Sequence, residues 1–197
     1  FITRLSIVSQ ATGVTTCKLI GKVQAHQGLA IKVVFSPKGE YMLTAGADGV
    51  IKVFGTTQWE RKISIKATTD DDTLTDMKMS PNSQYLVVSA KSGNIKFFET
   101  SFWTRLNVVH IQNDEISEIT FSPDSRLLFV GGYEKAISIF DMMKVEKTVN
   151  LTGHETWISC LEHSPKDRLL VSGAWDGSVF MWDTQEMKLK KSFKEHT

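Results

Sequence analysis

The chain has 197 residues, of which 41% are hydrophobic, so it is long enough to bury a sizeable core. No stretch approaches the roughly 20 consecutive apolar residues that a membrane-spanning helix needs. Its 23 Lys and Arg against 22 Asp and Glu leave a net charge of +1, and such a balance argues against nucleic acid or an anionic membrane as the main partner.

The first predicted elements are two strands, at 5–8 and 17–23. An internal repeat follows them. All four prolines of the chain follow a serine, and these pairs recur every 44, 42 and 42 residues, at Ser36-Pro37, Ser80-Pro81, Ser122-Pro123 and Ser164-Pro165. No gap is needed to align the segments as far as an aromatic residue 18 positions after each serine, which is Phe54, Phe98, Phe140 and Trp182.

Each repeat is predicted to form four short strands. Apolar residues alternate with polar or small ones, as at Ile31, Val33 and Phe35, which is the period of a strand and not of a helix. In the fourth repeat the strand-like runs are separated by SPKD, WDG and TQE, which are rich in turn-forming residues; the runs are 157–163, 168–174, 178–183 and 187–193.

The fourth repeat resembles a WD40 repeat, because Gly153-His154 opens it and Trp182-Asp183 closes its third strand, and the period of 42 to 44 residues agrees. The resemblance covers nearly the whole chain. It implies an all-β fold: a WD40-type β-propeller segment with four complete four-stranded blades plus a partial blade, belonging to a larger propeller of seven or eight blades. A five-bladed ring closed by a strand from elsewhere is the alternative.

The whole chain, 1–197, is therefore expected to be one propeller segment. Residues 1–25 form a partial blade, with 5–8 and 17–23 as its third and fourth strands. His196 follows Trp182 at the spacing that separates Phe140 from His154, so it is expected to open a further repeat. The complete blades are expected at 26–69, 70–111, 112–153 and 154–197, the last including the start of the next.

The resemblance also implies a buried hydrogen-bond network of His, Ser or Thr, Asp and Trp within each well-formed blade. Repeat four has all four members, and the Asp176 carboxylate is expected to accept from His154 and from the backbone. The full set is His154, Ser172, Asp176 and Trp182. Repeat one keeps His26, Thr44 and Asp48 but has Phe54 in place of the indole, so its network is expected to end at the hydroxyl.

Repeats two and three depart from this pattern. Their His positions are Asp70 and Gln112, and their hydroxyl positions are both valine. Their strands remain well patterned, so hydrophobic burial is expected to hold these blades in place.

Partner binding is expected at one rim, on the residue that precedes the position of the turn aspartate in each repeat, a position that is Ser92 in repeat two and Glu134 in repeat three. The preceding residues are Ala47, Lys91, Tyr133 and Trp175. Large aromatics at an exposed loop suit a binding hot spot; the alternative is that Trp175 only packs against the loop of the neighbouring blade. Trp157 is expected to join Trp175, with Asp114 and Glu115 as neighbours from the equivalent loop of repeat three.

The function expected is that of a non-catalytic scaffold that binds other proteins, the subunits of a larger complex. The alternative is a reader of a short, modified peptide at the rim or central channel. No catalytic, phosphate-binding or metal-ligating constellation stands out, so no enzyme activity, no cofactor and no small-molecule substrate is expected. No secretory signal is recognisable, and we expect an intracellular protein, cytoplasmic or nuclear.

Overall fold

The computed structural model describes residues 2–9, 15–68 and 72–194. Two positions discussed above, Asp70 and His196, lie outside them. The described residues form strands joined by turns, and none forms a helix of the length and apolarity needed to cross a membrane.

The strands group into four four-stranded antiparallel sheets and one antiparallel pair. The pair is β1 (Ile2–Ser9) with β2 (Thr15–Val23). The first two sheets contain β3 (Ala30–Phe35), β4 (Tyr41–Gly46), β5 (Val50–Gly55), β6 (Arg61–Lys66), β7 (Leu74–Met79), β8 (Tyr85–Ala90), β9 (Asn94–Glu99) and β10 (Thr104–His110). The last two contain β11 (Ile116–Phe121), β12 (Leu127–Gly132), β13 (Ala136–Asp141), β14 (Glu146–Thr152), β15 (Ile158–His163), β16 (Leu169–Ala174), β17 (Ser178–Asp183) and β18 (Lys188–Lys194).

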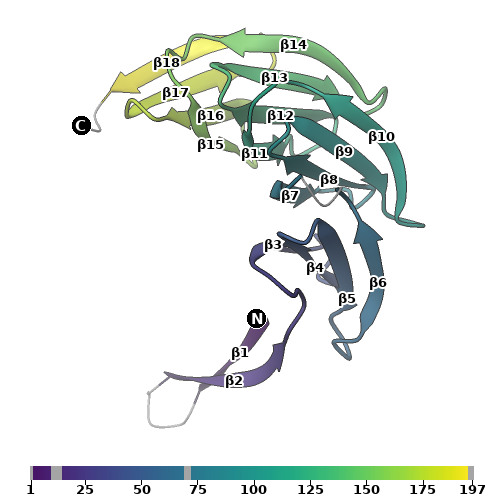
Figure 1. Ribbon diagram of the computed structural model, residues 1–197. Helices are drawn as coiled ribbons and strands as arrows, with labels where there is room; N and C mark the ends of the chain where they lie inside the picture. Colours follow the sequence, from purple (N-terminus) through teal and green to yellow (C-terminus); the bar gives the residue numbers. More distant parts are fainter. Residues whose placement is uncertain (1, 10–14, 69–71, 195–197) are drawn as a thin grey trace.

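Each sheet is one blade, and we number the blades one to four in chain order. Figure 1 shows them fanning along an arc, with β1 and β2 at its start. The first strands of successive blades, β3, β7, β11 and β15, contact one another and line the inner side of the arc, whereas β6, β10, β14 and β18 lie outside. This is the partial propeller expected from the repeat; a full count of seven or eight blades stays a prediction.

The core consists of layers between blades and not of one central cluster. One buried cluster joins blades one and two around Leu43 and Met77, a second joins blades two and three, and a third joins blades three and four around Phe129 and Trp182. The repeated aromatic contributes in every blade, because Phe54, Phe98, Phe140 and Trp182 are all at most 4% exposed. Alternating side chains thus fill the gap between twisted sheets.

The Ser-Pro pairs recur because each serine closes the turn between the first two strands. Its hydroxyl accepts a backbone N–H five residues on in blades one, two and three, with distances of 2.9 Å in each. In blade four Ser164 instead accepts from Asp167 N at 3.2 Å. The turn between the third and fourth strands lies at the same end of each sheet and has its own signature, a left-handed residue before the outermost strand, at Trp59, Trp103, Val145 and Met187.

Trp59 and Trp103 lie in the turn between the third and fourth strands of blades one and two. Trp103 packs on the cluster between blades one and two, where its ring meets Tyr41 edge-on at 5.8 Å between centroids. Trp59 packs against the small cluster of Ala25, Met42 and Phe54. Both are structural residues.

Candidate partner-binding rim

One edge of the blades is built from two loops of each repeat that hydrogen-bond to each other. The residue after the second strand donates its N–H to the carbonyl of the residue just before the first strand. The pairs are Ala47 to Leu29 at 2.9 Å, Lys91 to Thr73 at 2.9 Å, Tyr133 to Glu115 at 3.1 Å and Trp175 to Trp157 at 3.0 Å. Equal spacing in the repeat therefore places these eight residues along one rim.

Three large aromatics meet on this rim where blades three and four adjoin. The rings of Tyr133 and Trp157 stack at 4.4 Å between centroids with planes 28° apart. Trp157 in turn meets Trp175 edge-on at 5.6 Å. Trp157 is 42% exposed and Trp175 is 68% exposed, so the cluster combines mutual packing with a large apolar surface in contact with solvent.

The ring contact of Trp175 differs from the packing alternative, which placed it against the loop of the neighbouring blade. Trp175 contacts Trp157 of its own blade, and Trp157 is the residue that reaches Tyr133 of the neighbouring blade. Trp157 thus joins the blades, while most of Trp175 remains exposed.

The neighbouring part of the rim is charged. Lys91 Nζ of blade two lies 3.9 Å from a carboxylate oxygen of Glu115 of blade three; the Lys91 side chain is exposed and that of Glu115 is half-buried. Asp114 is exposed beside them. Gln112 holds this loop by donating from Nε2 to the carbonyls of Asp114 and Glu115 at 3.1 and 2.7 Å. The six residues expected at the rim are thus arranged along adjacent loops, although their role in binding a partner stays a prediction.

Beneath the rim, blade one contains the three-membered network expected from its sequence. His26 Nδ1 lies 3.0 Å from both carboxylate oxygens of Asp48, and Nε2 lies 2.8 Å from Thr44 Oγ1. Burial opposes ionisation of Asp48, but hydrogen bonds from His26 and from Val50 N–H outweigh it and hold the pKa of this carboxyl below its usual value. The chain of bonds ends at Thr44.

Blade four differs from the expectation in one link. His154 Nε2 lies 2.6 Å from Ser172 Oγ, and Trp182 Nε1 donates to the same hydroxyl at 2.8 Å, as expected. The prediction of a direct bond from His154 to Asp176 was wrong: His154 Nδ1 instead lies 3.3 Å from Ser178 Oγ, which donates to Asp176 at 2.6 Å. Asp176 still accepts Ser178 N–H, at 3.1 Å.

The physical reason is the residue two positions after the aspartate. Blade one has Val50 there, which leaves the carboxylate free to reach His26, whereas blade four has Ser178, whose hydroxyl competes for the carboxylate and then serves the histidine. The hydroxyl and N–H of Ser178 hold the pKa of the Asp176 carboxyl below its usual value. Ser178 is visible in the sequence two positions after the aspartate, but the pattern of the resemblance does not include it in the network.

In the second and third blades other residues take over this task. Asp72 accepts from Ser92 N at 3.1 Å and from Ser92 Oγ at 2.8 Å, which ties the loop to the turn as Asp48 does in blade one. Gln112, at the His position of blade three, bonds to carbonyls of its own loop. These blades lack the His-centred network, as expected.

The arrangement offers no catalytic chemistry around His154. The ring is buried and stacks on Phe180 at 4.0 Å, and its two nitrogens lie against serine hydroxyls inside the blade. Burial lowers the pKa of His154, so the ring is neutral near pH 7. Within the described residues no three His, Cys, Asp or Glu side chains lie close enough to hold a metal ion.

Comparison with solved structures shows the same fold. The chain superposes on a structure of U3-55K with a TM-score of 0.80 and 18% identity, over 88% of this chain and 54% of that one. It matches a crystal structure of RRP9 WD40 repeats with a TM-score of 0.80 and 19% identity, over 88% of this chain and 53% of the other. The chain thus spans about half the length of either. No curated protein matches it at a significant level.

The family model for the WD domain, G-beta repeat, matches four segments of the chain, at 17–55, 60–99, 103–141 and 145–183. The second, third and fourth of these segments each begin near the outermost strand of one blade and end with the third strand of the next. One sequence repeat therefore contributes the outermost strand of one blade and the first three strands of the next. Because these matches cover most of the chain, the protein belongs to the WD40 repeat family.

Proposed function

We propose that this protein is a non-catalytic scaffold that holds other proteins together in an assembly, and that it binds one of them through the Tyr133, Trp157 and Trp175 cluster. WD40 domains generally bind other proteins, although the fold alone does not say which. The observation that carries the proposal is the exposure of two tryptophans that cluster with Tyr133 at the rim where blades three and four adjoin. We further propose that it works inside the cell, in the cytoplasm or nucleus.

The geometry of the cluster favours a protein surface over a modified peptide as its partner. A cage for a methylated ammonium group needs aromatic faces turned toward a common empty space. Here one face of Trp157 is covered by Tyr133 and its side meets Trp175. Such a contiguous patch suits the apolar centre of a protein interface, with Lys91, Asp114 and Glu115 as part of a polar border.

The test compares wild type with a Tyr133→Ala/Trp175→Ala variant, each tagged and purified from the protein's own cells with the proteins that accompany it. We expect a stoichiometric partner with wild type and its loss with the variant, because truncating a hot-spot aromatic costs about 2 kcal/mol or more of binding. Thermal melting must show that the variant is folded.

A Phe102→Ala variant is the matched control. Phe102 is 79% exposed but lies in the turn between β9 and β10, at the opposite edge of the blade. If the aromatic variant retains every partner, the rim is not the interface. Partners lost equally with Phe102→Ala would contradict the assignment to this cluster.

A further inference from the structure

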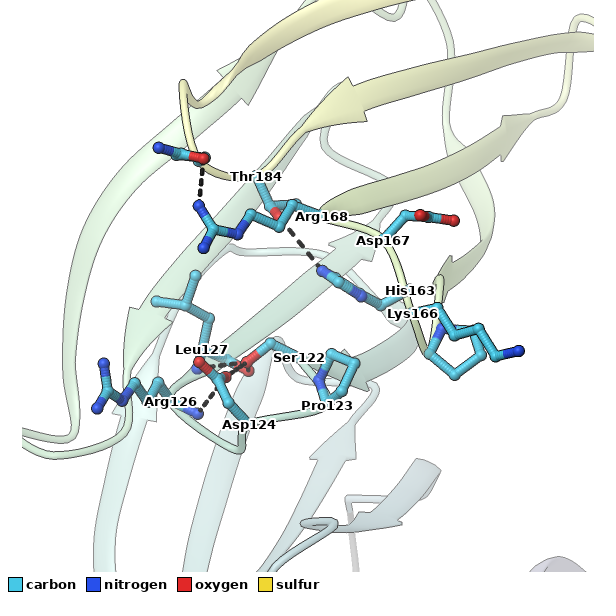
Figure 2. A pocket seen from close by; sticks show the side chains of 12 residues that line it. Ser122, Pro123, Asp124, Arg126, Leu127, His163, Lys166, Asp167, Arg168 and Thr184 are labelled. Carbon is cyan, nitrogen blue, oxygen red and sulfur yellow. Dashed lines mark hydrogen bonds between the residues drawn. The ribbon is translucent and has the colours of Figure 1, made fainter.

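A second surface lies at the opposite edge, between blades three and four. It is a pocket of about 380 Å³ formed by the turns that follow β11 and β15 and by the start of the turn after β17. Figure 2 shows Arg126 and Arg168 extending from two of these turns, with Leu127 between them in this view. The same register position is Glu40 in repeat one and Gln84 in repeat two, so only this pair of blades has two arginines there.

Two differences from the preceding blades are found at the pocket. Between blades two and three, Ser125 Oγ accepts from Asn82 N at 2.9 Å and ties the two turns together. At the register of Ser125, blade four has Asp167, which turns back to Ser164. The innermost strand also ends in His163 where blade three has Phe121. The smaller, buried ring leaves room in the groove.

His163 is held rigidly as part of the wall. Its Nδ1 lies 2.8 Å from the carbonyl oxygen of Ser164 and is the donor, so Nε2 accepts from Thr184 Oγ1 at 3.3 Å. The ring also lies against Phe129 at 5.5 Å between centroids. This wall of the pocket is therefore ordered by contacts within the protein and needs no ligand to order it.

The charged side chains that line the pocket differ in their partners: the carboxylates are hydrogen-bonded within their own turns, whereas the arginines have no acidic partner in a salt bridge. Asp124 accepts from Ser122 Oγ at 2.6 Å and from Arg126 N at 3.1 Å, so its carboxylate serves its own turn, and Asp167 does the same with Ser164. Among the described residues, the guanidinium of Arg168 bonds to the neutral amide of Gln185, and neither arginine forms a salt bridge. Burial opposes ionisation of Asp124, but the hydrogen bonds from Ser122 and from Arg126 N–H, and after them the charge of Arg126, hold the pKa of this carboxyl below its usual value. Two arginine heads thus remain available to an anionic group.

An apolar contact adjoins the arginines. A second hollow shares Asp124, Arg126 and Leu127 with the pocket and continues to Met143. Met143 is 82% exposed, at the tip of the turn between β13 and β14. Its unbranched side chain adapts to a variety of apolar partners.

We infer that this edge binds a polypeptide segment of a partner protein, in which an Asp or Glu carboxylate pairs with Arg126 and Arg168 and a nearby apolar side chain covers Met143. A guanidinium matches a carboxylate through two parallel hydrogen bonds, which gives both strength and orientation. The site lies on the opposite edge of the blades from the aromatic rim. It does not depend on the function proposed for the rim.

The probe is a phage-displayed library of random 12-residue peptides, selected on the wild-type protein after depletion on an Arg126→Gln/Arg168→Gln variant. We expect the retained peptides to be enriched in Asp or Glu beside Leu, Ile, Met or Phe. Retained peptides without acidic enrichment, or no peptide retained by wild type after depletion, would overturn the proposal.

A selected peptide is then synthesised with a fluorescent label and titrated by anisotropy. We expect Kd to rise at least ten-fold for the double arginine variant and several-fold for Met143→Ser, while Arg105→Gln on an outer strand changes nothing. A Trp157→Ala variant must also bind normally, which separates this site from the rim. An unchanged Kd for the double variant would contradict the inference. Thermal melting verifies that each variant is folded.

Discussion

At the scale of single residues, small differences between repeats decide how each blade is stabilised. The two His-centred networks begin alike, with a histidine nitrogen against a buried hydroxyl. They diverge at one position, because Ser178 is inserted between His154 and Asp176 whereas Val50 lets Asp48 bond His26 directly. The hydroxyl of Ser178 is thus sufficient to change the hydrogen-bond partner of the aspartate from the histidine to the serine.

Removing this hydroxyl tests the relay. Ser178→Ala removes the hydroxyl that lies between His154 Nδ1 and Asp176 and frees the carboxylate to bond the histidine directly, as Asp48 does in blade one. The net loss is one hydrogen bond, so we expect the free energy of unfolding to fall by about 1 kcal/mol. Urea denaturation measures it. Ser192→Ala on exposed β18 of the same blade is the control and should change it by less than about 0.5 kcal/mol; equal losses would contradict the relay.

The neutral state of His154 predicts a dependence on pH. Its folded-state pKa lies below the usual 6.5 because of burial, so the unfolded chain takes up the proton first on acidification. The stabilisation is present above the usual pKa and is lost as the pH falls below it. From about pH 7.5 to about pH 5.5, wild type should lose stability with a slope up to about 1.4 kcal/mol per pH unit larger than that of His154→Gln.

Urea denaturation at several pH values gives these slopes. His110→Gln, at an exposed histidine on β10, is the control and should keep the wild-type slope. A His154→Gln variant whose stability varies with pH as steeply as wild type would show that other groups cause the effect.

At the scale of elements, the innermost strands are joined by ion pairs between charged residues that the repeat pattern does not reveal. Asp76 on β7 is 1% exposed, lies 2.7 Å from Lys32 Nζ on β3 and accepts from Ile119 N on β11 at 3.0 Å. Glu118 completes the group through Lys32 and Lys78, at 3.7 and 3.4 Å. Burial and the neighbouring Asp76 raise the pKa of Glu118. One carboxylate thus joins three blades.

Truncation of this carboxylate should be costly. Asp76→Ala leaves the N–H groups of Met77 and Ile119 without acceptors in a buried strand and deprives Lys32 of its closest partner. We expect the free energy of unfolding to fall by about 3 kcal/mol. Differential scanning calorimetry and urea denaturation check this, with Glu146→Ala on exposed β14 as a control expected to be nearly neutral. A loss under about 1 kcal/mol would show that the strands do not depend on Asp76.

At the scale of the whole molecule, stability resides in contacts between neighbouring blades. Each large buried cluster joins two blades, so the same register position is buried or exposed according to whether a blade lies against it. Phe121 at the end of β11 is 7% exposed, whereas Phe35 at the equivalent place on β3 is 57% exposed.

These two phenylalanines form a matched pair for a test. Phe121→Ala should lower the free energy of unfolding by about 3 kcal/mol, because it removes a packed ring from the layer between blades two and three. Phe35→Ala should cost less than about 1 kcal/mol, because much of its ring already contacts water. Urea denaturation of both variants gives the comparison; similar losses would show that the face of β3 is covered in solution.

Much of this architecture followed from the sequence alone. The Ser-Pro spacing predicted the repeat because each serine hydroxyl closes the same turn, and alternating apolar residues predicted the strands because their pleat exposes every second side chain to a neighbouring blade. The rim positions followed from the same register, since equal spacing places equivalent loops at one edge.

Only the tertiary structure decided which residues meet across blades. The stack of Tyr133 on Trp157, the ion pairs around Asp76 and the pocket between Arg126 and Arg168 each join residues from different repeats. The repeat register gives each residue its place within a blade, but side-chain direction and the twist between sheets determine which neighbours it reaches. The sequence therefore determined the blades and their order, while contacts between blades determined the surfaces available to partners.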